Sequence, residues 1–478
     1  MKDIGKRHAE KLATLAERRG WTNNKIIAAT RKELADGDNN HTITLTLTRN
    51  QIERLAQEDR ELISEIEVHA EPQNTLAQAM FHTGVNPHAL SYANHQGAGI
   101  GIYMTELNCP NPGYISNYTR LGGTTDNHSE LVSSILRGVS PQSWVYCRSG
   151  TTLPSYDDIW GDPITYQCGV EDWEGQDIPV YCTYSPQDIK VVNMSAGYLG
   201  TGRYYTNIDR DWDDFVYNNP VATFLAAGNN HPLQGLNVAT PAKSLNVTSI
   251  GNYDDTNNTI HPSSSYINSF INNEKPEISF PGTGITAGGH TDTGTSFASP
   301  PAAAAAADFM SAWPQFQSAP ARMKALMLSA PREDIIGGID KVGVGGFDYL
   351  SAKGGWSWWW TGLNGAFSYM DSQDYLPNNG RIDVKKHLDA SLSKVWVSLA
   401  WLNRGTYIFN SNGNIGMDMD LIVYDPNGNL IKQSATLNNP YEMLSFDPQV
   451  SGEYRISIAR TRNNDTASKI DMGLVLNY

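Results

Sequence analysis

Five short, nearly continuous apolar runs constrain the fold of this 478-residue chain more than any other feature. Helical stretches separate the runs, which are GAGIGIYM, IKVVNMSAG, VATFLAAGN, LNVTSIG and EISFPG. Strands that are apolar throughout are typical of a parallel sheet covered on both faces. The alanine-rich run SFASPPAAAAAADFMSAW predicts a buried central helix, because small side chains allow close packing. The pattern therefore predicts an α/β domain with a mostly parallel sheet over residues 76–358.

Different patterns flank this region. Residues 1–75 contain two polar helical stretches, then the alternating run HTITLTLT, a further helix and a strand ending at Pro72, which together predict a small α+β domain. After GGWSWWW the chain alternates polar and apolar residues in KVWVSLAWL, DMDLIVYDPNG, EMLSFDP and GEYRISIAR. Turn signals such as Pro426-Asn427-Gly428 separate these runs. Residues 366–478 are therefore predicted to form an antiparallel, jelly-roll-like β-sandwich.

Charge and hydropathy exclude two classes of partner. The formal net charge of −15 repels phosphate backbones, so we expect no nucleic-acid binding. No stretch approaches the roughly 18 consecutive apolar residues of a membrane span. The first residues, MKDIGKRHAEKLATLAERRG, are charged rather than apolar. We expect a secreted or periplasmic protein whose signal peptide is absent from this numbering, with an intracellular protein as the alternative.

Four cysteines fall within one loop-rich region: Cys109, Cys147, Cys168 and Cys182. None of them has CxxC spacing, which argues against a zinc site. Their even number favours one or two disulfides over buried thiols, and the pairing stays open.

The most specific string is GTSFASP, residues 294–300, directly before the alanine-rich helix. A serine at a helix N-terminus lies where the dipole and free N–H groups favour developing negative charge. Alone, Ser296 would be read as an ordinary N-cap residue. The whole string resembles the nucleophile motif of the subtilisin (subtilase) family of serine peptidases. This resemblance implies that Ser296 is a nucleophile.

A nucleophilic serine needs a general base, because its free hydroxyl attacks weakly. His128 lies in DNHSELVSSI, residues 126–135, where it begins a predicted helix. The string resembles the family's histidine motif, although Ser129 and Leu131 stand where the family has glycine and a second histidine. The resemblance implies that His128 is the base.

The family order of acid, histidine and serine places the acid upstream of His128. Glu106 ends the predicted strand GIGIYMTE at the position where the family has aspartate. Glutamate can orient an imidazole, as Ser-His-Glu hydrolases show, but it reaches one methylene further. Asp126 is the rival, although a residue two before His128 on the same loop is poorly placed to meet its far nitrogen. We therefore expect Glu106 to be the acid.

Two other segments resemble family motifs that hold the substrate. Asn229 ends FLAAGN and resembles the asparagine that donates to the tetrahedral oxyanion together with the Ser296 N–H; alone it would be a turn asparagine. The resemblance also implies that an extended polypeptide binds along two stretches, beside the small pocket residue Ala239. These are Ser195, Ala196 and Gly197 in VNMSAG, and Ala226, Ala227 and Gly228 in FLAAGN.

The flanking regions resemble known accessory parts less specifically. Residues 41–72 look like the second half of a subtilase propeptide, which implies an intramolecular chaperone and inhibitor; an accessory domain is the alternative. The C-terminal region resembles sandwich domains appended to secreted peptidases. Asp418, Asp420 and Asp425 are candidate Ca²⁺ ligands. Because Asp418 and Asp420 have the period of two of a strand face, a solvated face is the favoured interpretation.

The sequence thus predicts a serine endopeptidase that acts through an acyl-enzyme with a Glu-His-Ser triad and needs no cofactor for its chemistry. One alternative is a catalytically impaired relative that binds polypeptide, because Glu106 and the histidine motif depart from the family pattern. A second alternative is an adhesion or glycan-binding protein dominated by its C-terminal sandwich.

Overall fold

The computed structural model describes residues 76, 83, 85, 96–150, 153–155, 158, 164–173, 176–184, 189–363, 368–369, 374–376, 380–465 and 467–478. All of them belong to one compact unit, Asn74–Tyr478. The α+β domain predicted for residues 1–75 lies outside the described residues.

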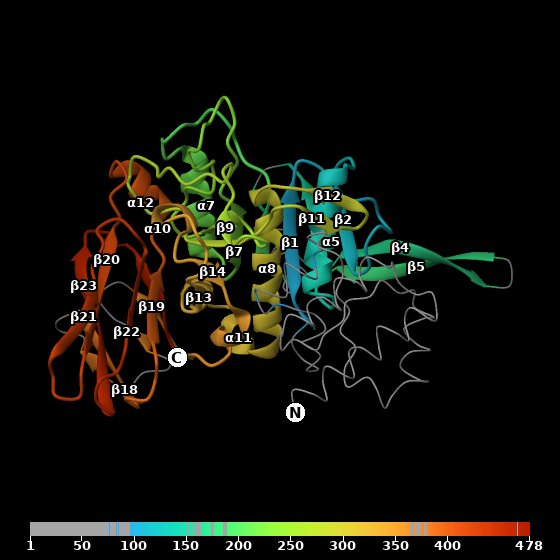
Figure 1. Ribbon diagram of the computed structural model, residues 1–478. Helices are drawn as coiled ribbons and strands as arrows, with labels where there is room; N and C mark the ends of the chain where they lie inside the picture. Colours follow the sequence, from blue (N-terminus) through green and yellow to red (C-terminus); the bar gives the residue numbers. More distant parts are fainter. Residues whose placement is uncertain are drawn as a thin grey trace, which may run out of the picture. The chain divides into compact units, whose positions relative to one another are not determined.

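A ten-stranded, mostly parallel sheet forms the centre of this unit (Figure 1). The α/β fold predicted from the apolar runs is confirmed, since all five runs contribute a strand: β1, β6, β7, β8 and β10. Across the sheet the order is β13 (Pro331–Arg332), β14 (Gly346–Phe347), β10 (Ile278–Pro281), β8 (Thr248–Asp254), β7 (Ala222–Ala226), β6 (Ile189–Met194), β1 (Gly101–Glu106), β3 (Trp144–Ser149) and β2 (Tyr118–Gly122). The short strand β9 (Thr259–Ile260) pairs antiparallel with β8, and β13 pairs antiparallel with β14.

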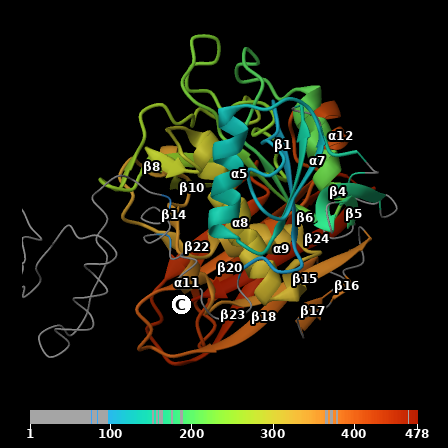
Figure 2. The same cartoon turned by 90° about the vertical axis from the view of Figure 1, so that its right-hand side faces the viewer.

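Helices cover both faces of the sheet, which explains why its strands are apolar on both sides. Along β1, Ile102 and Met104 pack into one core with α5 (Asn127–Val139) and α8 (Thr295–Ala312). Tyr103, which points to the other face, packs with α7 (Asn207–Asn218). Figure 2 shows α5 and α8 side by side.

The central helix α8 is buried on all sides. Its residues from Phe297 to Met310 are all buried, as expected for a helix that is apolar all round. Pro300 and Pro301 lie inside it, so the carbonyls of Ser296 and Phe297 lack their usual helical N–H partners. Among the described residues, no helix is long and apolar enough to cross a membrane.

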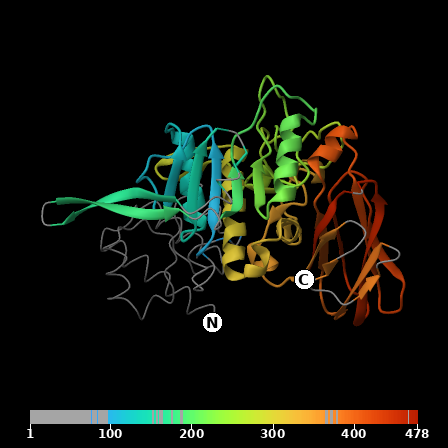
Figure 3. The same ribbon diagram turned by 180° about the vertical axis from the view of Figure 1, so that it is seen from behind.

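Two antiparallel hairpins that no sequence pattern indicated interrupt the α/β arrangement. β4 (Ile164–Trp173) pairs with β5 (Gln176–Tyr184), and this long ribbon is visible in Figure 3. β11 (Ile285–Ala287) pairs with β12 (His290–Asp292) directly before α8. The remaining short helices are η2 (Pro314–Phe316), α9 (Pro320–Leu328), α10 (Ile339–Val342), α11 (Tyr349–Ala352) and α12 (Gly405–Asn410).

The C-terminal region forms two five-stranded antiparallel sheets that enclose a core of their own, as predicted. One sheet has the order β16 (Ser368–Tyr369), β15 (Trp356–Leu363), β24 (Lys469–Asn477), β19 (Val395–Trp401) and β22 (Tyr441–Phe446). The other has the order β17 (Asp374–Leu376), β18 (Arg381–Leu388), β23 (Gly452–Asn463), β20 (Met417–Tyr424) and β21 (Leu430–Ser434). Strand β15 begins before residue 366, so the first sheet takes in the tryptophan-rich segment.

The first C-terminal sheet packs against α9. Ser398 donates a buried hydrogen bond of 2.5 Å to the Ala325 carbonyl, and Val475 belongs to the same core as α8 and α9. A reciprocal pair joins the two regions again, because Asn246 Nδ2 donates to the Asn403 carbonyl at 2.7 Å and the Asn403 N–H donates to Asn246 Oδ1 at 2.9 Å. The sandwich therefore shares buried surface with the α/β region.

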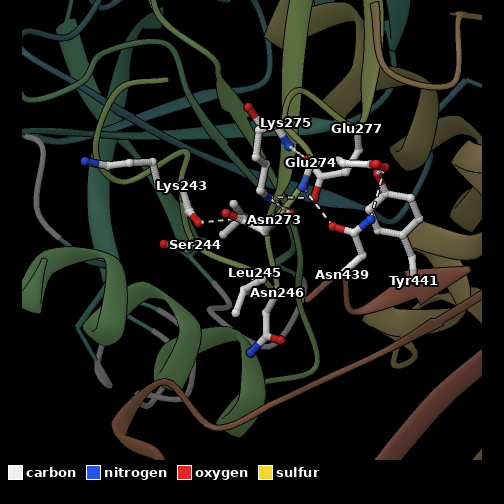
Figure 4. A network of polar contacts seen from close by, with 12 residues as sticks. Lys243, Ser244, Leu245, Asn246, Asn273, Glu274, Lys275, Glu277, Asn439 and Tyr441 are labelled. Atoms are coloured by element: carbon white, nitrogen blue, oxygen red, sulfur yellow. Dashed lines mark hydrogen bonds and ion pairs between the residues drawn. The ribbon is translucent and has the colours of Figure 1, made fainter. Parts of the chain in front are cut away.

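A buried network of charged and polar groups lies at this junction (Figure 4). Glu277 Oε1 accepts from Lys275 Nζ at 2.6 Å and from Lys324 Nζ at 2.7 Å, and none of the three side chains is more than 3% exposed. Beside them, Asn439 accepts from the Glu274 N–H at 2.8 Å and donates to its carboxylate at 3.0 Å. One carboxylate just before β10 thus pairs in the interior with two ammonium groups, one from its own segment and one from α9.

One disulfide, between Cys109 and Cys147, is present. It joins the loop that follows β1 to strand β3. Cys168 and Cys182 lie on the paired strands β4 and β5, but their side chains are not among those described. The prediction of a disulfide is confirmed for the first pair.

Candidate active site

Three chain segments bring the predicted triad residues to one region. Glu106 is the last residue of β1, His128 is the second residue of α5, and Ser296 is the second residue of α8. In a parallel sheet the carboxyl ends of the strands share one edge, and the following helices begin beside it. The fold therefore places an acid, a base and a nucleophile at the same edge.

Glu106 and His128 face each other directly. Glu106 Oε2 lies 3.4 Å from His128 Nδ1, and the glutamate side chain is only 1% exposed. The other carboxylate oxygen accepts a hydrogen bond of 2.8 Å from the Ser195 N–H. A distance of 3.4 Å is longer than the usual 2.7–3.2 Å, but hydrogen bonds between catalytic groups are often long without substrate. Both oxygens of the longer side chain are thus directed at defined partners.

This carboxylate changes the acidity of the imidazole. Burial, the largest single influence, acts to lower the pKa of His128, and the hydrogen bond and charge of Glu106 act to raise it. The charges of Asp126 and Asp292 add to the effect of Glu106. The pKa of His128 is therefore above its ordinary value, and the imidazolium form is stabilised.

Asp126 is engaged elsewhere. It is the N-cap of α5, where its carboxylate accepts from the Ser129 N–H at 2.7 Å and from Asn108 Nδ2 at 2.7 Å. Partial burial acts to raise the pKa of Asp126, but these hydrogen bonds hold it below the usual range. Capping therefore accounts for Asp126, and Glu106 is the carboxylate at His128 Nδ1.

Ser296 directly precedes the phenylalanine that packs against His128, and its hydroxyl faces a backbone carbonyl. The Ser296 hydroxyl donates to the Ser195 carbonyl at 2.7 Å. The His128 ring packs against the ring of Phe297, with centroids 5.2 Å apart. The residue that follows Ser296 therefore contacts the histidine, while the Ser296 hydroxyl is turned toward the end of β6.

A buried link that the sequence analysis did not identify holds this end of β6 against α8. Asn193 Oδ1 accepts from Ser299 Oγ at 2.9 Å, and Asn193 Nδ2 donates to Ser195 Oγ at 3.0 Å. Ser195 in turn contacts both Glu106 and Ser296 through its backbone. A polar Asn-x-Ser at the end of an apolar strand was the available signal.

Asn229 lies against the residues that precede the nucleophile. Its Oδ1 accepts from the Thr295 N–H at 3.0 Å, and a Cβ added at Gly294 would lie 3.1 Å from its Nδ2. The amide nitrogen makes no hydrogen bond to any residue in the described part of the chain. Beside it, Gly294 is the N-cap of α8 and provides no side-chain hydrogen bond. Free donors therefore gather where Ser296 lies.

The predicted substrate-binding residues fall into two groups. No hydrogen bond within the described residues uses the backbone of Ala196 or Gly197, so this edge is open to an extended chain. Ala227 differs, because its N–H donates to the Ile250 carbonyl at 3.0 Å and its carbonyl accepts from Ala239 at 2.8 Å. The backbone of the second stretch, Ala226, Ala227 and Gly228, is therefore mostly engaged within the protein. The Gly228 N–H, for example, donates to Thr295 Oγ1 at 3.1 Å.

The candidate calcium ligands do not converge. Asp425 caps its own turn by accepting from the Asn429 N–H at 2.8 Å. Asp418 and Asp420 lie on β20, and the expectation of a solvated face is wrong for Asp418, which is 2% exposed. Burial raises the pKa of Asp418 to about 6, and Arg462 lies 3.9 Å from it. Within the described residues, no cluster of three His, Cys, Asp or Glu side chains is placed to hold a metal ion.

Comparisons with known proteins give one family match. Residues 123–350 match the model of the subtilase family. A search among curated protein sequences found no match.

Several solved structures resemble the chain. The prenylagaramide maturation protease PagA is 18% identical over 53% of this chain and 92% of its own, with a TM-score of 0.38. A protease from Pseudoalteromonas arctica PAMC 21717 is 16% identical over 59% and 94%, with a TM-score of 0.40. The MycP3 protease of the type VII (ESX-3) secretion system is 14% identical over 60% and 90%, with a TM-score of 0.40. These scores lie below 0.5, so they give no information about substrate or partner.

Proposed function

We propose that this protein, a serine peptidase whose residues 123–350 form a subtilase-family domain, is an endopeptidase. Its proposed triad is Glu106, His128 and Ser296. The observation that carries the proposal is the 3.4 Å contact between Glu106 Oε2 and His128 Nδ1, beside the helix that presents Ser296. The full engagement of Asp126 as a helix cap supports the same assignment.

Acylation follows from these positions. The Ser296 hydroxyl turns from the Ser195 carbonyl toward His128 Nε2, which takes its proton as Oγ attacks the substrate carbonyl carbon. Glu106 holds the proton-bearing Nδ1 side of the ring and stabilises the imidazolium. When the peptide C–N bond breaks, His128 returns the proton to the leaving amine. Water then attacks the ester by the same route and releases the acid and Ser296.

The oxyanion is held by donors at the start of α8. Asn229 Nδ2 and the Ser296 N–H would donate to it, and the positive end of the helix dipole favours the same charge. The Asn229 amide nitrogen, which has no hydrogen-bond partner among the described residues, and the N-terminus of α8, which has no side-chain cap, support this assignment. Every group in the mechanism belongs to the chain, so no cofactor is required for the chemistry.

The substrate is proposed to be polypeptide in extended conformation. The unused backbone groups of Ala196 and Gly197 can pair with it as an added strand. Ala239 lies close to two glycines of this region: a Cβ added at Gly197 would lie 3.1 Å from its Cβ, and one at Gly228 would lie 2.9 Å from it. The walls beside the bound chain are therefore built from small residues.

Residues 1–75 are proposed to act as an intramolecular inhibitor and chaperone in a secreted or periplasmic enzyme. The Cys109–Cys147 disulfide supports an oxidising compartment. If the enzyme removes this segment, freshly expressed wild-type protein should be cleaved between residues 71 and 98, whereas Ser296→Ala stays intact. Intact mass spectrometry of the two proteins tests this, and identical masses would refute self-cleavage.

Hydrolysis of an unfolded polypeptide by wild type and Ser296→Ala tests the endopeptidase proposal itself. Internal cleavage by the wild type alone is the expected result. The alternative, polypeptide binding without cleavage, draws on the orientation of the Ser296 hydroxyl toward Ser195. It predicts that both proteins bind the unfolded chain and that neither cleaves it.

A further inference from the structure

The β11–β12 hairpin connects the two halves of the proposed site. It ends at Asp292, four residues before Ser296, and it packs on α5, the helix that carries His128. Any shift of this hairpin relative to α5 would move the nucleophile relative to the base.

The turn of the hairpin rests directly on α5. Gly288 has φ of +56°, and a Cβ there would overlap Ser134 Oγ on the helix. The Tyr114 hydroxyl donates a hydrogen bond to the Gly288 carbonyl. The turn therefore needs glycine for its conformation and for its close approach.

A hydrogen bond joins the same two elements closer to the site. Glu130 Oε2 lies 3.1 Å from His290 Nε2, and the side chains are 16% and 28% exposed. The Tyr114 ring packs beside the imidazole, with centroids 6.2 Å apart. A hydrogen bond this well covered competes with water less than one between fully exposed side chains does.

Each partner lies close in sequence to one of the proposed catalytic residues. Glu130 lies two residues after His128 on α5, and His290 lies six residues before Ser296. We propose that Glu130 and His290 are positioning residues that hold the nucleophile segment in register with the base. Neither touches the reacting atoms, and the inference rests on the proposed function. Effects of this kind are large, since a misplacement of about 1 Å can cost about 10²-fold in rate.

The test uses the full chain with Glu130→Ala, His290→Ala, the double variant and the conservative His290→Gln. His387→Ala serves as a matched control, because His387 is an exposed histidine whose carboxylate partner, Asp389, lies 3.9 Å away in the C-terminal region. Each protein is assayed for kcat and KM with a peptide substrate and for amide hydrogen exchange of residues 285–292.

Each alanine variant should lose about 10- to 100-fold in kcat with KM within about twofold, and the double variant should be no worse than either single. His290→Gln keeps a side-chain N–H and should recover most of the rate. Exchange of the hairpin amides should rise in the alanine variants only.

Wild-type kcat in both alanine variants, or losses that multiply in the double variant, would overturn the proposal. Should folded wild type show no peptidase activity, the proposed function fails separately. In that case hydrogen exchange still tests the positioning role, which unchanged protection of residues 285–292 in Glu130→Ala would refute.

Discussion

At the scale of single residues, the extra methylene of Glu106 is the main departure from the family pattern. It lets one carboxylate oxygen accept from the Ser195 N–H at 2.8 Å while the other lies 3.4 Å from His128. An aspartate at this position would fall short of one of these partners. The glutamate is therefore matched to its surroundings rather than tolerated by them.

Replacing Glu106 should change both the rate and its pH dependence. Glu106→Gln keeps the shape but removes the charge, so kcat should fall by on the order of 10³- to 10⁵-fold. The base works only when neutral, so activity is lost as pH falls through the pKa of His128, which Glu106 raises. The acidic limb of the kcat/KM profile should therefore move to lower pH in the variant. A limb that stays in place would show that Glu106 is not the partner of His128.

Asn229→Ala should lower kcat by about 10²- to 10³-fold with little change in KM, because the donor serves a charge present mainly in the transition state. Asn230→Ala is the matched control, since Asn230 is the exposed neighbour and its backbone N–H donates to the Ser263 carbonyl at 2.7 Å. Steady-state kinetics, measured with a substrate for which acylation limits the rate, would separate the two variants. Equal rates for the two variants would remove Asn229 from the oxyanion site.

At the scale of elements, local sequence patterns predicted the strands and helices near the site. The strand that ends at Glu106, the strand that precedes Ser195 and the helix that contains Ser296 follow from runs of apolar residues, and the structure contains them. The contact between Glu130 and His290 joins residues 160 positions apart. No periodicity marks such a contact. The disulfide pairing stayed open in the sequence for the same reason. The β11–β12 hairpin was missed although its contacts are local, because each of its strands has only three residues.

The Cys109–Cys147 disulfide should stabilise the attachment of the loop after Glu106 to strand β3. It closes a loop with a sequence separation of 38, and chain-entropy arguments assign such a cross-link about 2–4 kcal/mol. Cys109→Ser and Cys147→Ser should each lower the free energy of unfolding by this amount in urea titrations. Losses under about 0.5 kcal/mol for both would show that the cross-link adds nothing to folding.

At the scale of the whole molecule, the C-terminal sandwich is joined to the α/β region by buried polar groups. Asn246 and Asn403 exchange hydrogen bonds across the junction, and Asn439 of the sandwich bonds to Glu274. On the α/β side, next to Glu274, the Glu277 carboxylate pairs with Lys275 and Lys324. Buried charges that lose a partner are costly because no water replaces it. The two regions should therefore unfold together rather than as separate modules.

Glu277→Gln should lower the free energy of unfolding by about 3–5 kcal/mol, because it leaves two buried ammonium groups without an anion. The control is Glu333→Gln, which breaks the solvent-exposed pair with Lys394 and should change stability by under about 1 kcal/mol. Denaturant titration followed by tryptophan fluorescence and by circular dichroism compares the two. Equal stability of the variants would contradict a structural role for this network.

Mapping of a covalent adduct tests the central claim most directly. Folded wild-type protein is treated with an organophosphonate, digested and examined by mass spectrometry. The proposed triad predicts one adduct per chain, on the peptide that contains Ser296, and no adduct in Ser296→Ala or in wild type unfolded beforehand. Absence of labelling in folded wild type, or an adduct on another serine, would contradict the assignment of Ser296 as the activated nucleophile.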